Sequence, residues 1–348
     1  QGTLVGVRSV VGNFSYIETG FMITGYYVGY LIGSIFIPYF LKNVGHIRVF
    51  AALASLASIA ILLHSIIILP FAWFLIRILT GLSIAGIFVI MESWLNEKST
   101  NKTRGTLLST YMIITFSFLG LGSFLLNVSD PAKFDLFILV SLLLSFAIIP
   151  ILLTSTNAPN FENPKILTFS KLYEISPLGF VGAILIGLAH STVFGLGAVY
   201  AKKIDFNNFE VSLFIVIVTI SGSLFQWPIG FISDKIDRRV VLIILTLIAS
   251  GICILIIGSS FISTILLFIL LAIYAGMSLP LYSVTIAHTN DYLQPDEFVA
   301  ASSAIAVLVG LGAIFGPIAT SYFMSIIGAN GFFVFLFLVH VFLGFFGI

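Results

Sequence analysis

The sequence predicts an all-α integral membrane protein of twelve helices arranged as two halves of six. Of its 348 residues, 59% are hydrophobic and only 8% are charged, and the mean hydropathy is +1.17. Soluble domains are about a quarter charged, so this composition excludes a soluble globule. Apolar runs of about 20 residues match helices that cross a bilayer, whereas barrel strands would give short alternating segments.

The apolar runs place the spans in chain order. The chain begins with Gln1, and its first run is shorter than a bilayer requires, so we expect a truncated first helix. This run has no basic segment or cleavage site before it, which argues against a signal peptide. The spans are expected near residues 1–13, 19–41, 47–66, 71–94, 105–127, 134–154, 177–200, 210–232, 239–258, 261–286, 298–324 and 329–348.

A polar segment divides the chain after the sixth span. Residues 155–176 are rich in Thr, Asn, Pro, Glu and Lys, and no span can pass through them. We therefore predict an N-terminal six-helix half at 1–154, a linker at 155–176 and a C-terminal six-helix half at 177–348. Two such halves suggest parallel repeats with a solute path at their interface.

The basic residues predict the orientation, because Lys and Arg collect on the cytoplasmic side of membrane proteins. Three of the fifteen lie in loops at the end away from the linker, and Arg8 and Arg77 fall within spans. The other ten lie at the linker end. We expect the protein in the inner membrane, with its linker end in the cytoplasm. These ten are Lys42, Arg48, Lys98, Lys102, Arg104, Lys165, Lys171, Lys235, Arg238 and Arg239.

A dense charged turn, G-F-I-S-D-K-I-D-R-R at residues 230–239, lies between the eighth and ninth spans. Gly230 lets two helices approach closely, and Asp234 can accept hydrogen bonds from the backbone or an arginine. We expect Gly230, Asp234, Arg238 and Arg239 to form a conformational latch. A weaker counterpart with Arg48 follows the second span but has no Asp. The alternative is an ordinary positive-inside loop.

These residues carry a family resemblance. The charged turn resembles the loop between the second and third helices of a half in the major facilitator superfamily, and R-I-L-T-G at 77–81 resembles the R-x-x-x-G of its fourth helix. The likeness covers almost the whole chain and implies a twelve-helix secondary transporter. The G-P signature of the superfamily's antiporters is absent from span 5, which disfavours a drug antiporter. Strings similar to the YcaD-like subgroup are E-S-W-L-N-E at 92–97, Q-W-P-I-G at 226–230, A-H-T-N-D at 287–291 and F-V-A-A-S-S at 298–303.

Two arginines fall within predicted spans, where contact between a charged side chain and lipid is energetically costly. Arg77 is about six residues into span 4, and a charge at that depth needs water, a partner or a cavity. We expect Arg77, with Thr80 one turn later, to face the solute pathway. The alternative is that Arg77 extends to the nearer interface. Arg8 in the first span is interpreted in the same way.

Glu92 follows Arg77 by fifteen residues, which places it about 22 Å further along the helix and rules out a direct pair. We expect Glu92 to meet Arg48 or Lys42 as part of a cytoplasmic latch, and Asp291 to play the same part for Arg238. The alternative is a solvated carboxylate at the interface.

Span 7 contains His190, the most central of the five histidines. A histidine titrates near neutral pH, so His190 is a candidate carrier of a coupling proton; the alternative is a neutral, hydrogen-bonded core residue. Tyr274, Ser278 and Tyr282 begin a polar stripe on span 10 that Thr285 and Thr289 continue. This stripe lines a cavity or forms hydrogen bonds between helices.

Glycines at four-residue spacing predict flat helix faces. They occur at positions 25, 29 and 33 on span 2, and at 312 and 316 on span 11. By the family resemblance, these two faces would meet across the halves.

The function expected is a secondary active transporter that moves a small solute across the inner membrane by alternating access. A proton gradient is the expected energy source, because the motifs of nucleotide binding, hydrolysis and metal chemistry are absent. The single cysteine, Cys253, excludes a disulfide framework and a thiol metal site. We expect a monomer in the lipid bilayer without cofactor, metal or nucleic acid, and we leave the direction open, with export as one option. The alternatives are a facilitated uniporter, or a sensor or intramembrane enzyme built on a transporter fold.

Overall fold

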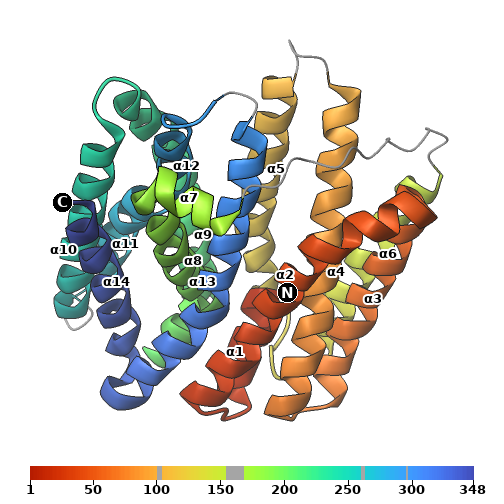
Figure 1. The fold of residues 1–348 in the computed structure, drawn as a ribbon. Helices are drawn as coiled ribbons and strands as arrows, with labels where there is room; N and C mark the ends of the chain where they lie inside the picture. The colour runs from red at the N-terminus through yellow and green to blue at the C-terminus, as the bar shows by residue number, and fades with distance from the viewer. Residues whose placement is uncertain (100–103, 154–167, 260–262, 295–296) are drawn as a thin grey trace.

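The computed structural model describes residues 1–99, 104–153, 168–259, 263–294 and 297–348 (Figure 1). We call the helices up to residue 153 the N-half and those from residue 168 onward the C-half. The N-half contains α1 (Gly2–Val11), α2 (Tyr16–Val44), α3 (His46–Ile66), α4 (Pro70–Lys98), α5 (Arg104–Ser123), the short 3-10 helix η1 (Phe124–Asn127) and α6 (Asp135–Leu152).

The C-half begins with a short helix that the sequence did not predict, α7 (Phe169–Ile175), inside the expected linker. Thr168 caps this helix, and Leu172 is fully buried against the C-half. The other helices are α8 (Pro177–Lys203), α9 (Asn208–Ser233), α10 (Arg238–Ser259), α11 (Thr264–Ser278), α12 (Leu281–Asn290), α13 (Phe298–Ile327), η3 (Gly328–Asn330) and α14 (Gly331–Gly347).

Hydropathy and length mark ten segments of the described residues as long enough to cross a membrane. The last of these, at 300–347, contains both α13 and α14, and the chain turns between them where Gly328 adopts a φ of 71°. With the ten-residue helix α1, this gives the twelve spans in the predicted order. The protein is therefore a multi-pass membrane protein.

Span 10 differs from its prediction as one helix at 261–286. It is divided into α11 and α12 at Leu279 and Pro280, and it continues to Asn290. Proline has no backbone N–H and its ring clashes with the preceding turn, so a break at this point is the expected physical result. The polar stripe therefore lies on two helices rather than one.

The second helix of each half begins with the same local structure. Ser15 and Glu18 form a capping box at the start of α2, and Asn207 and Glu210 form one at the start of α9. Both boxes satisfy backbone N–H groups that the first helical turn leaves unpaired. Two residues before each cap, Asn13 and Asp205 have positive φ values of 57° and 65°.

The phenylalanine after each of these positive-φ residues is buried and packs on an aromatic ring of a later span. Phe14 lies 5.0 Å from the Trp73 ring of α4, and Phe206 lies 5.4 Å from the Phe268 ring of α11, measured between ring centres. The two turns are therefore equivalent in sequence, backbone and packing, as parallel repeats require.

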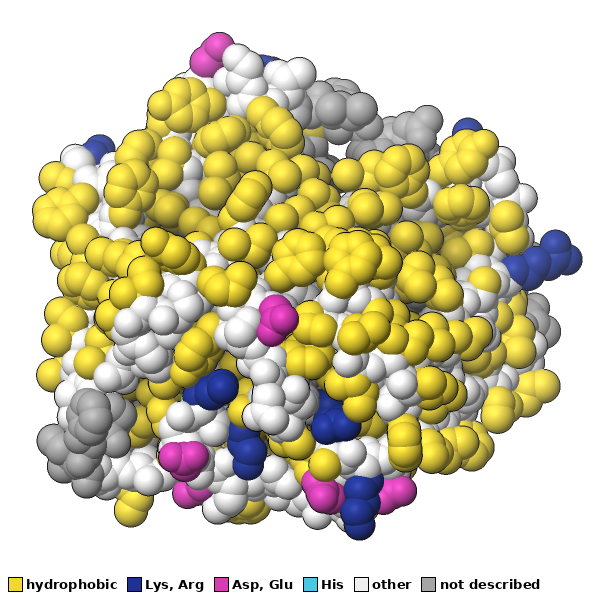
Figure 2. Space-filling model, turned by 90° about the horizontal axis from the view of Figure 1, so that it is seen from below, with side chains coloured by type: hydrophobic (Ala, Val, Ile, Leu, Met, Phe, Trp, Pro, Cys, Tyr) yellow, Lys and Arg dark blue, Asp and Glu magenta, His cyan; other side chains and the backbone are white. Residues whose placement is uncertain are grey.

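All spans except α1 run between two ends, and Figure 1 shows both. The linker end, at the top, contains the end of α2, the start of α3, the α9–α10 turn and the end of α12. The distal end, at the bottom, contains the α1–α2 turn and the α13–α14 turn. Figure 2 views the distal end, where charged side chains are scattered among hydrophobic ones.

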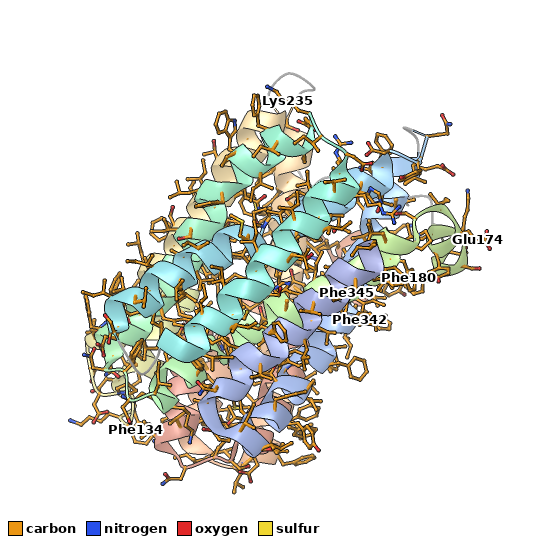
Figure 3. The ribbon with its side chains drawn as sticks, turned by 90° about the vertical axis from the view of Figure 1, so that its left-hand side faces the viewer. Phe134, Glu174, Phe180, Lys235, Phe342 and Phe345 are labelled. Carbon is orange, nitrogen blue, oxygen red and sulfur yellow. The ribbon has the colours of Figure 1, made fainter. Side chains whose placement is uncertain are left out.

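The outer surface of the bundle is hydrophobic, as contact with lipid requires. Phe342 and Phe345 project outward from α14 and are 57% and 67% exposed (Figure 3). The same view shows Lys235 and Glu174 at the linker end and Phe134 at the distal end.

Candidate functional site

The two halves meet near the distal end through α2 of the N-half. Thr24 donates a hydrogen bond from its hydroxyl to the Ile314 carbonyl of α13, at 3.0 Å. Tyr27 donates to the Ser191 carbonyl of α8, at 3.3 Å. Gly20 lies so close to α13 that a Cβ there would overlap the Ser321 side chain.

A second contact between the halves joins the end of α5 to the start of α9. The Ser123 hydroxyl donates to the Ser212 carbonyl at 3.1 Å, and the Ser212 hydroxyl donates to the Ser123 carbonyl at 2.8 Å. The Asn127 amide also donates to the Ser212 hydroxyl, at 3.1 Å. This reciprocal pair satisfies polar groups that would be costly to leave alone in a bilayer.

The buried hydrophobic clusters of the two halves are separate toward the linker end. One large cluster of buried side chains includes residues of both halves, such as Ile61 and Trp73 with Val199 and Phe332. Two smaller clusters are each confined to one half: Ile37 to Ile90 in the N-half, and Leu172 to Leu308 in the C-half. Among the described residues, the halves thus share a buried hydrophobic cluster distally and have separate clusters toward the linker end.

Arg77 is buried near the distal part of α4, with 5% of its surface exposed. Its guanidinium carbon lies 4.5 Å from the centre of the Tyr26 ring of α2, a cation–π contact. Its Nε atom has no hydrogen-bond partner among the described residues. Thr80 is also buried, but its hydroxyl donates to the Ile76 carbonyl at 3.0 Å. Arg8, on the last turn of α1, is only half-buried.

His190 belongs to a polar cluster inside the C-half. Its Nε2 donates to the Ser278 carbonyl at 3.2 Å, where α11 ends before Pro280 and helix carbonyls lose their backbone partners. His340 of α14 lies beside the same residues, with its Nε2 at 3.1 Å from the Tyr274 hydroxyl and 3.3 Å from the Ser278 hydroxyl. The cluster therefore brings together three predicted residues from α8 and α11.

The charged turn connects three helices of the C-half. Arg238, at the start of α10, forms an ion pair with Asp234 at 2.8 Å and a second one with Asp291 at the end of α12. Arg239 donates from its Nε to the Gly347 carbonyl of α14, at 2.6 Å. The predicted contact between Arg238 and Asp291 is thus present, and the latch role stays a prediction.

Comparison with known proteins gives the family. The Sugar (and other) transporter model matches residues 8–162, and the Major Facilitator Superfamily model matches residues 179–348. The MFS-type transporter YcaD of Escherichia fergusonii is 27% identical over 312 residues, which is 88% of this chain and 80% of that protein. YcaD of Escherichia coli is 25% identical over 336 residues, which is 95% and 86% of the two chains.

The chain belongs to the major facilitator superfamily. It is a membrane transporter rather than an enzyme, and its partner is a small-molecule solute. Solved facilitators have the same fold. A variant of the nucleoside transporter NupG gives a TM-score of 0.81 at 14% identity, over 99% of this chain and 94% of that one. A bacterial homolog of the human lysosomal transporter Spinster, inward-facing and unoccupied, gives 0.73 at 13% identity, over 99% and 90%.

The ion pair predicted for Glu92 of this facilitator is not found among the described residues. In the part of the chain that the structure describes, it forms no ion pair with Arg48 or Lys42. Arg48 is exposed at the start of α3, whereas Glu92 is half-buried.

Three glycine predictions also need correction. Gly29 and its four-residue neighbours pack against α4, and Gly312 and Gly316 pack against α8. The helices α2 and α13 do meet, but through other residues, because a small-residue face specifies close approach without specifying its partner. Gly230 has open space where a Cβ would stand, so close helix approach is not its role in this conformation.

Sequence reasoning missed Tyr26, His340 and the repeated turn of this facilitator. The turn has a signal in the sequence, since N-F-S-x-x-E at 13–18 and D-F-N-x-x-E at 205–210 match position by position. The pairing of Arg77 with Tyr26 has none, because it depends on how α2 lies against α4.

A separate surface pocket of about 350 Å³ lies at the linker end of the C-half. Arg239, His288 and Tyr292 line it with the start of α8 and the end of α14. It is apart from the distal contacts of the two halves and contains none of the predicted pathway residues.

Proposed function

We propose that this facilitator is a secondary active transporter that moves a small solute across the inner membrane by alternating access. The observation that carries the proposal is the asymmetry of packing: the halves share one hydrophobic cluster distally and have separate clusters at the linker end. Such an arrangement is one of the two states that a rocking mechanism alternates between.

The orientation follows from charge. The sequence assigns ten of the fifteen Lys and Arg residues to the linker end, so we place that end in the cytoplasm and name this conformation inward-open. A reporter fused within residues 155–176 is then expected on the cytoplasmic side. A periplasmic reporter would reverse the assignment of the open end.

Proton coupling is the proposed energy source, and His190 is a proposed carrier. Its hydrogen bond to the Ser278 carbonyl joins α8 to the break in span 10, so a change in its charge acts where that span is already discontinuous. Because the partner is a carbonyl, which only accepts hydrogen bonds, a neutral His190 must hold its hydrogen on Nε2.

The test begins with a thermal-stability screen of the purified protein to find a solute that stabilises it. That solute is then followed in proteoliposomes with an imposed pH gradient. We expect the gradient to drive accumulation, and we expect the pH dependence of the rate to flatten in His190→Gln. Equilibration without accumulation would instead show a uniporter, and an unchanged pH profile in His190→Gln would return His190 to a structural role.

A further inference from the structure

The surface pocket at the linker end of the C-half lies where four spans begin or end. The start of α8 and the last turn of α14 form part of its lining. Arg239 comes from the first turn of α10, and His288 and Tyr292 come from the end of α12 and just beyond it. Among the described residues, none of the side chains that line the pocket is acidic.

Arg239 is a cation without a carboxylate partner. Its neighbour Arg238 forms ion pairs with Asp234 and Asp291, whereas Arg239 forms none with a described carboxylate. Asp237 accepts a hydrogen bond only from the backbone N–H of Arg239, at 2.8 Å. The guanidinium donates from Nε and Nη2 to the backbone carbonyls of the last two residues. A guanidinium has five N–H donors, so its Nη1 side remains available to a ligand.

Two buried polar side chains line the same pocket and lack partners. His288 is only 5% exposed, and in the described parts of the chain its ring nitrogens form no hydrogen bond; its ring lies 5.3 Å from that of Tyr292. Ser176 is 2% exposed, and its hydroxyl accepts from the Gly179 backbone N–H at 3.1 Å. The hydroxyl hydrogen has no described acceptor. Buried polar groups are nearly always hydrogen-bonded, so a ligand in the pocket would complete both.

The start of α8 adds a positive potential to this lining. Ser176 caps the helix, which runs for 27 residues from Pro177. The first turn of a helix has backbone N–H groups without helical partners, and the helix dipole makes this end positive. An unpaired guanidinium, a hydroxyl and a helix start are the groups that bind phosphate in proteins.

An apolar surface continues from the pocket to the outside of the bundle. Phe346 of α14 lines the pocket, and its ring stacks on that of Phe342, with the ring centres 6.4 Å apart. Phe342 is 57% exposed and projects from the outer surface (Figure 3). An acyl chain would gain from burying this surface, whereas a free phosphate ion would not.

We propose that this pocket binds a phosphate group, and that an anionic lipid carries it. Arg239, His288 and Ser176 bind the phosphate together with the start of α8, and an acyl chain lies along Phe346 and Phe342. Basic pockets between the ends of spans are suited to such headgroups. The inference goes beyond the transport proposed above and requires neither alternating access nor a coupling ion.

The experiment is a thermal-unfolding titration of the purified protein in a non-ionic detergent. The probes are phosphatidylglycerol and, in a separate series, sodium phosphate against sodium chloride at equal ionic strength. Arg239→Gln removes the cation, and Tyr292→Glu places a carboxylate in the lining at a position that is 60% exposed. Lys235→Gln is the matched control, because it removes an exposed cation at the same end that does not line the pocket (Figure 3).

We expect phosphatidylglycerol to raise the melting temperature of the parent. Its apparent affinity should fall by about tenfold in Arg239→Gln, as the loss of one charge-assisted hydrogen bond predicts. Tyr292→Glu should weaken binding by repulsion, and Lys235→Gln should bind as the parent does. No effect of inorganic phosphate would identify the lipid as the source. An equal rise with inorganic phosphate, lost in the same variants, would identify a soluble phosphate at the same site.

Two results would overturn the site. A rise with phosphatidylglycerol that has the same apparent affinity in the parent and all three variants would be a general effect of the lipid on the bundle. A parent that neither probe stabilises would show that the pocket binds no phosphate. Arg239 also holds the end of α14, so if Arg239→Gln does not fold, the comparison of Tyr292→Glu with Lys235→Gln decides the outcome.

Discussion

A guanidinium inside a span needs compensation, and Arg77 receives part of it from the Tyr26 ring at 4.5 Å. A cation–π contact of this kind contributes about 0.5–2 kcal/mol, more as the pair loses water. That is less than the cost of a charge at this depth. Among the described residues, the Arg77 Nε atom also has no hydrogen-bond partner, and we propose that the solute supplies one. An anionic group of the solute, bound by the planar fork, would satisfy it.

We predict that Arg77→Lys lowers the rate of solute transport by about tenfold, equivalent to about 1.4 kcal/mol. Lysine keeps the charge but loses both the planar fork and the flat contact with Tyr26. Arg77→Ala should lower transport further. The measurement is initial uptake into proteoliposomes at matched protein levels. Parental transport by Arg77→Lys would show that only the charge matters, and parental transport by Arg77→Ala would remove Arg77 from the pathway.

At the scale of the element, the contact between α2 and α4 positions Arg77 against Tyr26. Gly25, Gly29 and Gly33 lie on one face of α2, and each would place a Cβ against the α4 backbone or an adjoining side chain. Gly81 does the same in the opposite direction, against the Tyr26 carbonyl. The two helices thus approach until their backbones touch, and this closeness brings the ring over the guanidinium.

We predict that Gly29→Ala destabilises the protein by about 2 kcal/mol, in the range of overpacked cores. Its Cβ would overlap the Ile78 carbonyl oxygen, which is backbone and cannot rotate away. Thermal unfolding in detergent measures the effect. The control is Gly122→Ala on α5, where a Cβ meets open space. Equal melting temperatures for the two variants would show that α2 and α4 separate at little cost.

Hydropathy was sufficient to predict the spans, because a bilayer imposes length and apolarity on every crossing segment. The ion pair of Arg238 and Asp291 was also accessible from sequence, since complementary charges followed two spans that end on the same side. The break in span 10 could have been inferred from Leu279-Pro280. The partner of Arg77 and the surroundings of Glu92 could not, because they depend on helix rotations that a hydrophobic pattern leaves undetermined.

At the scale of the whole molecule, the charged turn joins separate helices of the C-half at the linker end. Arg238 links α12, the half of span 10 beyond the Pro280 break, to the α9–α10 turn. The carboxylates of Asp234 and Asp291 are 69% and 43% exposed, so each pair contributes at most about 1 kcal/mol. Energies of this size are too small to hold the fold together but large enough to bias two conformations.

We predict that Asp234→Asn and Arg238→Ala each shift the population by up to about fivefold, away from the state closed at the linker end. The amount of protein in the membrane should change little. The measurement is the rate of thiol labelling of Leu31→Cys from each side of the membrane, since Leu31 lies against Gly310 of the opposite half. Labelling rates equal to the parent's from both sides would reduce the charged turn to a topology signal.

The matching turns before α2 and α9 have a consequence for how the chain is made. Each turn is specified by neighbouring residues: a positive-φ residue and a capping box lie within six positions. A helical hairpin closed by such local contacts forms with a small entropic cost and without waiting for distant segments. During synthesis, the first hairpin can therefore take its native shape while the second half is still on the ribosome. The second hairpin has the same local sequence pattern, so each half contains its own starting point for insertion and folding.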